Sequence, residues 1–291
     1  MKLLKEVIAD VSFRLGKSRE RLIQGFKMWI NTREPSYVMR KTLRYYDKTD
    51  AHEPATTNLF KEIIHQGDNF VDIGANIGYF SLLAKSLGAD LVYSFEPEEK
   101  NFDYLQKNLA INGFNDVRAS SSAVSDNFGI SKLYLCGYDS GHHTLNQNEG
   151  ITEYRKTSLL RKMLDFFTKK RYKEIITTTL DYHLGFDKTK RVDVMKMDCE
   201  GSELLALNGM DKALRDNWDI KIVMEFFPLL LEKMGSKPED LVKKILDYGF
   251  KIYIIPHDYD GGEELLKVDN YSELMKHCSG REEHINLLLK R

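Results

Sequence analysis

The sequence is poor in cysteine and has no long apolar run. Three cysteines occur in 291 residues, Cys136, Cys199 and Cys278, and they form no C-x-x-C pair. This spacing excludes a disulfide scaffold and a cysteine-rich zinc site, so we expect reduced thiols. No apolar stretch approaches the ~20 residues that span a bilayer. The first residues lack the apolar core and cleavage site of a secretory signal, and we therefore expect a cytoplasmic protein.

The overall charge is nearly balanced, but its distribution along the chain is uneven. Hydrophobic residues make up 42% and charged residues 30%, which is typical of a globular protein, and the net charge is −1. Residues 1–33 and 151–175 each contain eight Lys or Arg against three Asp or Glu. Such segments can face an anionic partner, although we favour solvated helix surfaces.

The most informative stretch reads V-D-I-G-A-N-I-G-Y-F, from Val71 to Phe80. Apolar residues lead into a turn bracketed by Gly74 and Gly78, and apolar positions at helical spacing follow it. The pattern predicts a strand, a tight turn and a helix. This is the unit that holds a nucleoside-bearing cofactor in α/β folds.

The spacing of the glycines distinguishes between cofactors. Dinucleotide folds use G-x-G-x-x-G, in which the middle glycine lets the backbone approach a pyrophosphate, whereas Asn76 occupies that position here. The loop suits a smaller anion, such as an amino-acid carboxylate near the N–H groups of the helix start. Asp72 is placed to face an ammonium group. These features favour the methionine half of S-adenosyl-L-methionine, with cofactor contacts expected from Asp72, Gly74, Ala75, Asn76, Gly78, Tyr79 and Phe80.

The next strand, residues 91–95, supplies the other half of the predicted cofactor site. It ends at Glu96, roughly twenty residues after the glycine turn, where an acidic residue accepts hydrogen bonds from ribose hydroxyls. Pro97 ends that strand because it cannot donate to a ladder. A third strand is expected over 117–124, and small and polar groups at its end could flank an adenine: Val124, Ser125 and Asp126.

Strand 193–198 contains an unexpected charge. Central parallel strands are nearly continuous apolar runs, and Lys196 interrupts this one. Because strand side chains alternate, Lys196 and Asp198 share a face. A buried lysine needs a carboxylate partner, so we predict a charge network at the carboxyl edge of the sheet. Asp198 is expected both to catalyse and to contact the cofactor, and Glu200, Glu225 and His143 are the further catalytic candidates.

Transfer of a methyl group to an alcohol needs alignment of the reactants and a base for the hydroxyl proton. Asp198, Glu200 and Glu225 carry hard oxygen ligands that suit Mg²⁺. Nothing in their spacing requires an ion, and we predict no metal.

The sequence resembles the FkbM-type family of S-adenosylmethionine-dependent methyltransferases. The resemblance covers roughly residues 50–290 and rests on the motifs V-D-I-G-A-N-I-G, F-E-P, A-V-S-D, T-L-D and M-K-M-D-C-E-G, which start at residues 71, 95, 123, 179 and 195. It implies a Rossmann-like class I methyltransferase domain and methylation of a hydroxyl oxygen. The expected α/β fold has a mostly parallel seven-stranded sheet with helices on both faces.

We expect two parts in the chain. Residues 1–55 form an N-terminal helical extension and connector, with helices near residues 3–15 and 18–30. Residues 56–291 form the FkbM-like methyltransferase domain, in which residues 137–175 are an inserted lid over the substrate.

The expected partner is a small-molecule or glycan hydroxyl acceptor, and nucleic acid is not expected. The N-terminal helices are expected to cap the domain or pack in a homo-oligomer; the alternative is peripheral contact with a membrane surface. Two other functions stay open at this point: an NAD(P)-dependent oxidoreductase on a Rossmann fold, and a non-catalytic cofactor-binding module that contacts an anionic partner.

Overall fold

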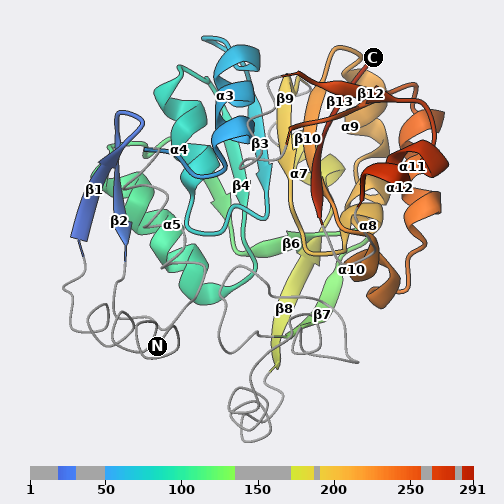
Figure 1. The fold of residues 1–291 in the computed structure, drawn as a ribbon. Coiled ribbons are helices and arrows are strands. Elements are labelled where there is room, and N and C mark those ends of the chain that lie inside the picture. Colours follow the sequence, from blue (N-terminus) through green and yellow to red (C-terminus); the bar gives the residue numbers. More distant parts are fainter. Residues whose placement is uncertain (1–18, 31–49, 135–171, 187–190, 257–263, 279–283) are drawn as a thin grey trace, which may run out of the picture.

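A mixed central sheet organises the computed structural model, which describes residues 19–30, 50–134, 172–186, 191–256, 264–278 and 284–291 (Figure 1). Eight strands are hydrogen-bonded in the order β12-β11-β13-β10-β9-β3-β4-β5. Their bounds are Leu266–Val268, Lys251–Ile254, Ile285–Lys290, Lys221–Phe226, Val194–Met197, Phe70–Ile73, Val92–Phe95 and Arg118–Ser120.

The five strands from β10 to β5 are parallel, and β13 is antiparallel to both of its neighbours. The chain first builds outward from β3 to β4 and β5, and then returns to add β9 on the other side of β3. The strand order therefore reverses between β3 and β9. Open α/β sheets bind ligands beyond the carboxyl ends of the strands at such a point.

Helices cover both faces of the sheet (Figure 1), as predicted. On one face, α3 (Pro54–Ile63), α4 (Tyr79–Ser86) and α5 (Glu99–Ile111) enclose one apolar core. The core of the other face includes residues of α7 (Leu180–Phe186), α8 (Glu203–Asn208), α9 (Asp211–Asp216), α11 (Pro238–Asp247) and α12 (Tyr271–His277), and α10 (Pro228–Lys233) packs near α11. Within the described ranges, no helix has the length and apolar character needed to cross a membrane.

The sheet differs from the prediction at its two edges. It has eight strands because β12 adds to β11 beyond the seven expected strands. The strand expected over 117–124 is two strands: β5 ends at Ser120, and β6 (Ser122–Val124) belongs to a second sheet. That second sheet has the order β6-β8-β7, with β8 at Tyr172–Thr178 and β7 at Gly129–Tyr134.

The helix predicted over residues 18–30 is wrong. The chain forms a β-hairpin there, with β1 at Arg19–Ile23 and β2 at Phe26–Ile30. Gln24 and Gly25 have φ values of 50° and 87°, and a two-residue turn with two positive φ values matches the twist of a hairpin. Every second residue of β2, beginning at Phe26, is buried. The helix predicted near residues 3–15 lies outside the described residues.

The hairpin packs against α5. The N–H of Trp29 donates to Oδ1 of Asn108 at 2.7 Å, and the N–H of Lys27 donates to Oδ1 of Asn112 at 2.7 Å. Asn108 is fully buried, and its amide also donates to the carbonyl of Ile77 in the glycine turn at 2.8 Å. One side chain thus joins the hairpin to the turn.

Replacement of Asn108 by alanine should destabilise the protein. The substitution leaves the Trp29 N–H and the Ile77 carbonyl without this partner, and an unsatisfied buried polar group costs about 1–3 kcal/mol. Chemical unfolding should show this loss, whereas Asn127→Ala, at an exposed position, should stay within about 0.5 kcal/mol of the parent. Equal stability of the two variants would contradict the described contact.

Candidate active site

The glycine turn between β3 and α4 contains three residues with a left-handed backbone: Gly74 (φ 77°), Asn76 (φ 51°) and Gly78 (φ 94°). A Cβ atom on Gly74 would lie 1.8 Å from the carbonyl oxygen of Asp198. The N–H of Asp198 in turn donates to the carbonyl of Ile73 at 3.0 Å. Gly74 is therefore needed because the loop after β9 packs directly against it.

The amides of this turn have partners inside the protein. The N–H groups of Gly74 and Ala75 donate to the carbonyl of Phe95, and that of Gly78 donates to Ala75. The N–H of Asn76 donates to Oε2 of Glu96 at 2.8 Å. The amides of Gly74, Ala75, Asn76 and Gly78 are therefore engaged within the protein, and a cofactor carboxylate beside the amides at the start of α4 stays a prediction.

Glu96 links the two strands of the predicted cofactor site. Its Oε1 accepts from the N–H of Glu98 at 2.9 Å, in addition to the bond from Asn76, and its side chain is buried. Burial raises the pKa of Glu96 to about 7, although the hydrogen bonds from the two amides act in the opposite direction. The Asn101 side chain also hydrogen-bonds to Glu96, so one of the four lone-pair sites of the carboxylate stays available to a further donor.

A hollow of about 650 Å³ lies at the carboxyl ends of the central strands. Its lining contains three carboxyl side chains, several small polar groups and an apolar wall, and among the described residues no Lys or Arg. The lining residues are Ile73, Gly74, Asn76, Phe95, Glu96, Pro97, Asn101, Ser122, Ala123, Val124, Leu133, Asp198, Cys199, Glu200 and Ser202. This composition suits an uncharged or positively charged ligand with hydroxyl groups.

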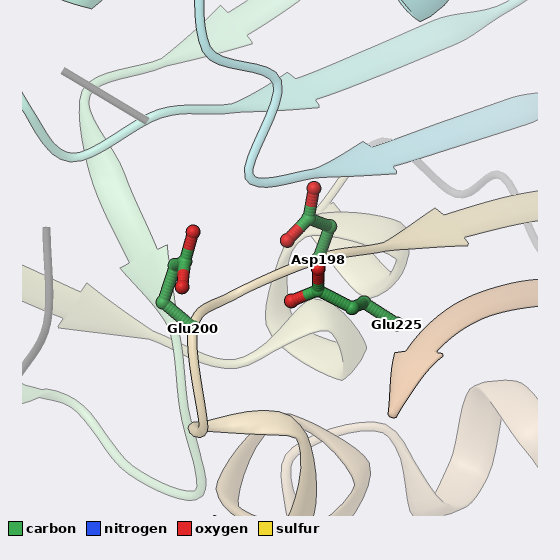
Figure 2. A group of neighbouring side chains, drawn as sticks. All are labelled: Asp198, Glu200 and Glu225. Atoms are coloured by element: carbon green, nitrogen blue, oxygen red, sulfur yellow. The ribbon is translucent and has the colours of Figure 1, made fainter. Parts of the chain in front are cut away.

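Two acidic lining residues, Asp198 and Glu200, lie close to a third acid, Glu225, which is not among the lining residues. Asp198 follows β9, Glu200 lies in the next turn, and Glu225 is late in β10 (Figure 2). One oxygen of each carboxyl group lies within 4.8 Å of the others. Such a set of hard ligands could hold a divalent cation, but acidic clusters also occur without an ion. The metal-free site stays a prediction.

The turn that presents Glu200 is backbone-strained and tightly packed. Glu200 has a φ of 54°, and a Cβ on Gly201 would lie 2.6 Å from the carbonyl oxygen of Leu230. Buried Glu203 accepts from the N–H groups of Cys199 and Gly201, each at 3.2 Å. A positive φ on a residue other than glycine persists where the surroundings enforce it, and such positions cluster at functional sites.

Burial and mutual repulsion raise the pKa values of the acidic groups. For Glu225, burial has the largest effect, the carboxylates of Asp198, Glu203 and Glu53 add to it, and Lys196 opposes it, so that its pKa lies well above the usual range. Burial also raises the pKa of Glu203 to about 7. His284 approaches Glu225, with Nε2 3.8 Å from Oε1.

The predicted network around Lys196 is present. Lys196 is 6% exposed, and its Nζ donates to Oδ2 of Asp198 at 3.0 Å. Asp72 is Lys196's register partner on β3 and is fully buried, with Oδ2 accepting from Ser81 at 2.6 Å. The sequence suggested that Asp72 faces a cofactor ammonium; the structure instead turns it into the interior beneath α4.

The structure brings part of the predicted site together. Seven predicted residues line the hollow: Gly74, Asn76, Glu96, Pro97, Val124, Asp198 and Glu200. Tyr79 and Phe80 lie in the apolar core with Ala75, and Gly78 packs against Leu105. Ser125 is buried and donates to Asp126, and neither is among the lining residues. His143 and residues 137–171 of the predicted lid lie outside the described residues.

Sequence reasoning missed several lining residues, among them Asn101, Leu133 and Ser202. Asn101 reaches the hollow from α5 and hydrogen-bonds to Glu96. Leu133 comes from the second sheet, which no local pattern places over the hollow. Cys199 also lines it, but burial raises the pKa of its thiol well above the usual range, which disfavours a nucleophilic thiolate.

The reversal of strand order beside β3, the glycine turn and the acid that follows β4 define a Rossmann-like class I methyltransferase fold. The Methyltransferase FkbM domain matches residues 72–252, and the chain belongs to this family of methyltransferases. The predicted family is therefore confirmed.

Two curated relatives are also methyltransferases. Methyltransferase sdnD of Sordaria araneosa is 27% identical over 246 residues, which are 76% of this chain and 91% of the relative. Methyltransferase 1 of Beauveria bassiana is 25% identical over 156 residues, covering 53% and 61%. Among solved structures, precorrin-6y C5,15-methyltransferase from Geobacter metallireducens has a TM-score of 0.39 at 10% identity, covering 82% and 89%; nothing further follows from so distant a likeness.

Replacement of Gly74 by alanine should disrupt the site. The new Cβ would overlap a backbone carbonyl of the neighbouring loop, so one loop has to move. Gly113 is a matched control, with a φ of 74° and nothing within 4 Å of an added Cβ. Thermal unfolding should show a cost of about 1–2 kcal/mol for Gly113→Ala, and several kcal/mol more for Gly74→Ala. Similar costs for the two variants would contradict the loop contact.

Proposed function

We propose that this chain transfers a methyl group from S-adenosyl-L-methionine to a hydroxyl oxygen of a small molecule or glycan. The observation that supports this is the hollow itself, whose lining contains Glu96, which is bonded to the glycine turn, together with Asp198 and Glu200. A carboxyl group that suits ribose hydroxyls and carboxyl groups that suit the proton of an alcohol thus line the same hollow. Membership of the FkbM family supports methyl transfer as the reaction.

The chemistry of the lining fits this cofactor. Glu96 would accept the ribose hydroxyls, and Phe95, Val124 and Leu133 offer an apolar wall for the adenine. Asp198 would face the positive charge of the sulfonium or ammonium group. When bound, S-adenosyl-L-methionine supplies an electrophilic methyl group on a positively charged sulfur.

The nicotinamide alternative is disfavoured by the same lining. A dinucleotide carries a pyrophosphate, which glycine-rich loops bind through free N–H groups at a helix N-terminus. Here the described lining contains no Lys or Arg, it contains three carboxyl groups, and the amides of Gly74, Ala75, Asn76 and Gly78 are engaged. Both the charge and the donors oppose a pyrophosphate.

Alignment and proton removal are the tasks left to the protein side chains. Asp198 is paired with Lys196 and would act as a fixed negative charge. Glu225 has a raised pKa and would take the hydroxyl proton, as a general base does. Glu200 and His143 are the further candidates for that role, and His143 lies outside the described residues. In this proposal Asp198 provides the fixed negative charge, and a different carboxyl group accepts the proton.

Cofactor affinity should depend on pH through Glu96. Burial raises its pKa to about 7 without ligand, and the ionised carboxylate accepts from ribose hydroxyls more strongly than the neutral acid does, so binding near neutral pH releases protons. Affinity for S-adenosylhomocysteine should therefore fall as the pH drops below 7, by up to about tenfold per pH unit. Calorimetry across neutral pH measures this.

Glu96→Gln should bind more weakly above pH 7 and lose the slope, whereas Glu99→Gln, at an exposed position on the same segment, should keep it. A Glu96→Gln variant with unchanged affinity and slope would remove the ribose assignment.

The reaction itself is tested with a panel of hydroxylated metabolites and glycans. Mass spectrometry should show one methyl added at oxygen, together with formation of S-adenosylhomocysteine. Glu225→Gln should slow the transfer by about 10²–10⁴-fold without weakening cofactor binding, and Glu62→Gln, at an exposed position on α3, should leave it unchanged.

The same assay with a chelator should proceed at an unchanged rate if no metal is required. Cofactor binding without transfer to any acceptor would favour the non-catalytic module. Methylation at nitrogen or carbon would contradict the assignment to oxygen.

A further inference from the structure

We propose that Lys196 and Asp72 are positioning residues that fix the carboxylate of Asp198 at the hollow. The inference rests on the proposed function, in which Asp198 faces the positive charge of the cofactor. It gives a role to two charged residues that do not themselves line the hollow.

Charged side chains follow one another from the interior to the site: Asp72 lies beside Lys196 on the neighbouring strand, and Lys196 pairs with Asp198. Asp72 and Lys196 are paired in register on adjacent parallel strands, so their side chains leave the same face of the sheet. Asp72 is fully buried, Lys196 is 6% exposed and the Asp198 side chain is 30% exposed. The ion pair of Lys196 with Asp198, at 3.0 Å, thus ends at the surface of the hollow.

Both ends of this series of charged side chains are anchored. Ser81 of α4 donates to Asp72 at 2.6 Å and lies 2.7 Å from Ser94 Oγ on β4. The backbone of Asp198 is held by the carbonyl of Ile73 and by its contact with Gly74. With backbone and one carboxylate oxygen both fixed, the rotation of the Asp198 side chain is restricted.

A purely structural role explains Lys196 poorly. Its neighbours on β9 are Val194, Met195 and Met197, all buried. An apolar residue at this position, with an uncharged partner on β3, would be at least as stable, because a buried ion pair seldom repays its desolvation. The lysine also counters the repulsion that Glu225 experiences from the carboxyl groups of Asp198 and Glu53. The need to hold the negative charge of Asp198 in a fixed position at the hollow explains why a lysine is buried here.

The test separates positioning from folding with paired substitutions. Lys196→Met leaves Asp72 buried without its cation and should lower the Tm. The double variant Asp72→Asn/Lys196→Met removes both interior charges and should regain most of the lost Tm. Both variants should still lose methyl transfer by ~10²-fold, the effect of a misplaced group, and bind S-adenosyl-L-methionine, which carries the positive sulfonium, more weakly.

Lys85→Met is the matched control, because Lys85 pairs with Asp116 at 2.7 Å on the far end of α4. It should keep wild-type transfer and affinity. Lys196→Arg keeps the charge and should retain more transfer than Lys196→Met at a similar Tm.

A double variant with restored Tm and wild-type transfer and affinity would overturn the inference. Failure of the wild-type protein to bind S-adenosylhomocysteine would instead overturn the proposed function. Wild-type binding of S-adenosyl-L-methionine that is weakened in the double variant, with no acceptor yet identified, supports positioning through affinity alone.

Discussion

The site depends on the contact between the loops that follow β3 and β9. Gly74 has no side chain, and so the carbonyl of Asp198 can lie where a Cβ would be, while the amide of Asp198 bonds to Ile73. One loop continues into the turn that engages Glu96, and the other continues into the acidic turn. Because these two backbones touch, the predicted cofactor residues and the candidate catalytic residues keep a fixed relative position.

Negative charge is the second constraint on this end of the sheet. The carboxyl groups of Asp198 and Glu203 raise the pKa of Glu225, and the charge of Lys196 lowers it. Asp198 also raises the pKa of Glu203. Concentrated charge of one sign costs folding energy, since each buried carboxyl prefers to be neutral. A positively charged ligand would offset this cost on binding, and the sulfonium of the proposed cofactor is such a charge. The strained backbone of Glu200 and the raised pKa of Glu225 thus occur in two carboxyl residues that are neighbours in space.

Local sequence patterns were sufficient to predict the features that depend on residues close together in the chain. The glycine turn, Glu96 after β4 and the lysine in β9 were predicted from spacing alone. The hairpin at 19–30 was missed because Leu22, Ile23, Phe26 and Ile30 also fit a helical repeat, and the Gln24–Gly25 turn decides between the two. The burial of Asp72 could not be predicted, because it depends on Ser81 reaching back from α4. Asn101 and Leu133 reach the hollow only through packing between elements.

The second sheet supplies part of the lining of the hollow. The chain leaves the central sheet between Ser120 and Ser122, so that Ser122, Ala123 and Val124 face the hollow together with Leu133 of the same small sheet. Lys173 of β8 then bonds to Glu98 and Glu99, which follow the strand of Glu96. The apolar wall is therefore attached to the segment that contains Glu96, and Val124 of the wall also packs in one core with Met197 of β9 and Met224 of β10. The wall and the acidic turns are thus parts of one packed unit, so a substitution in either can shift the other.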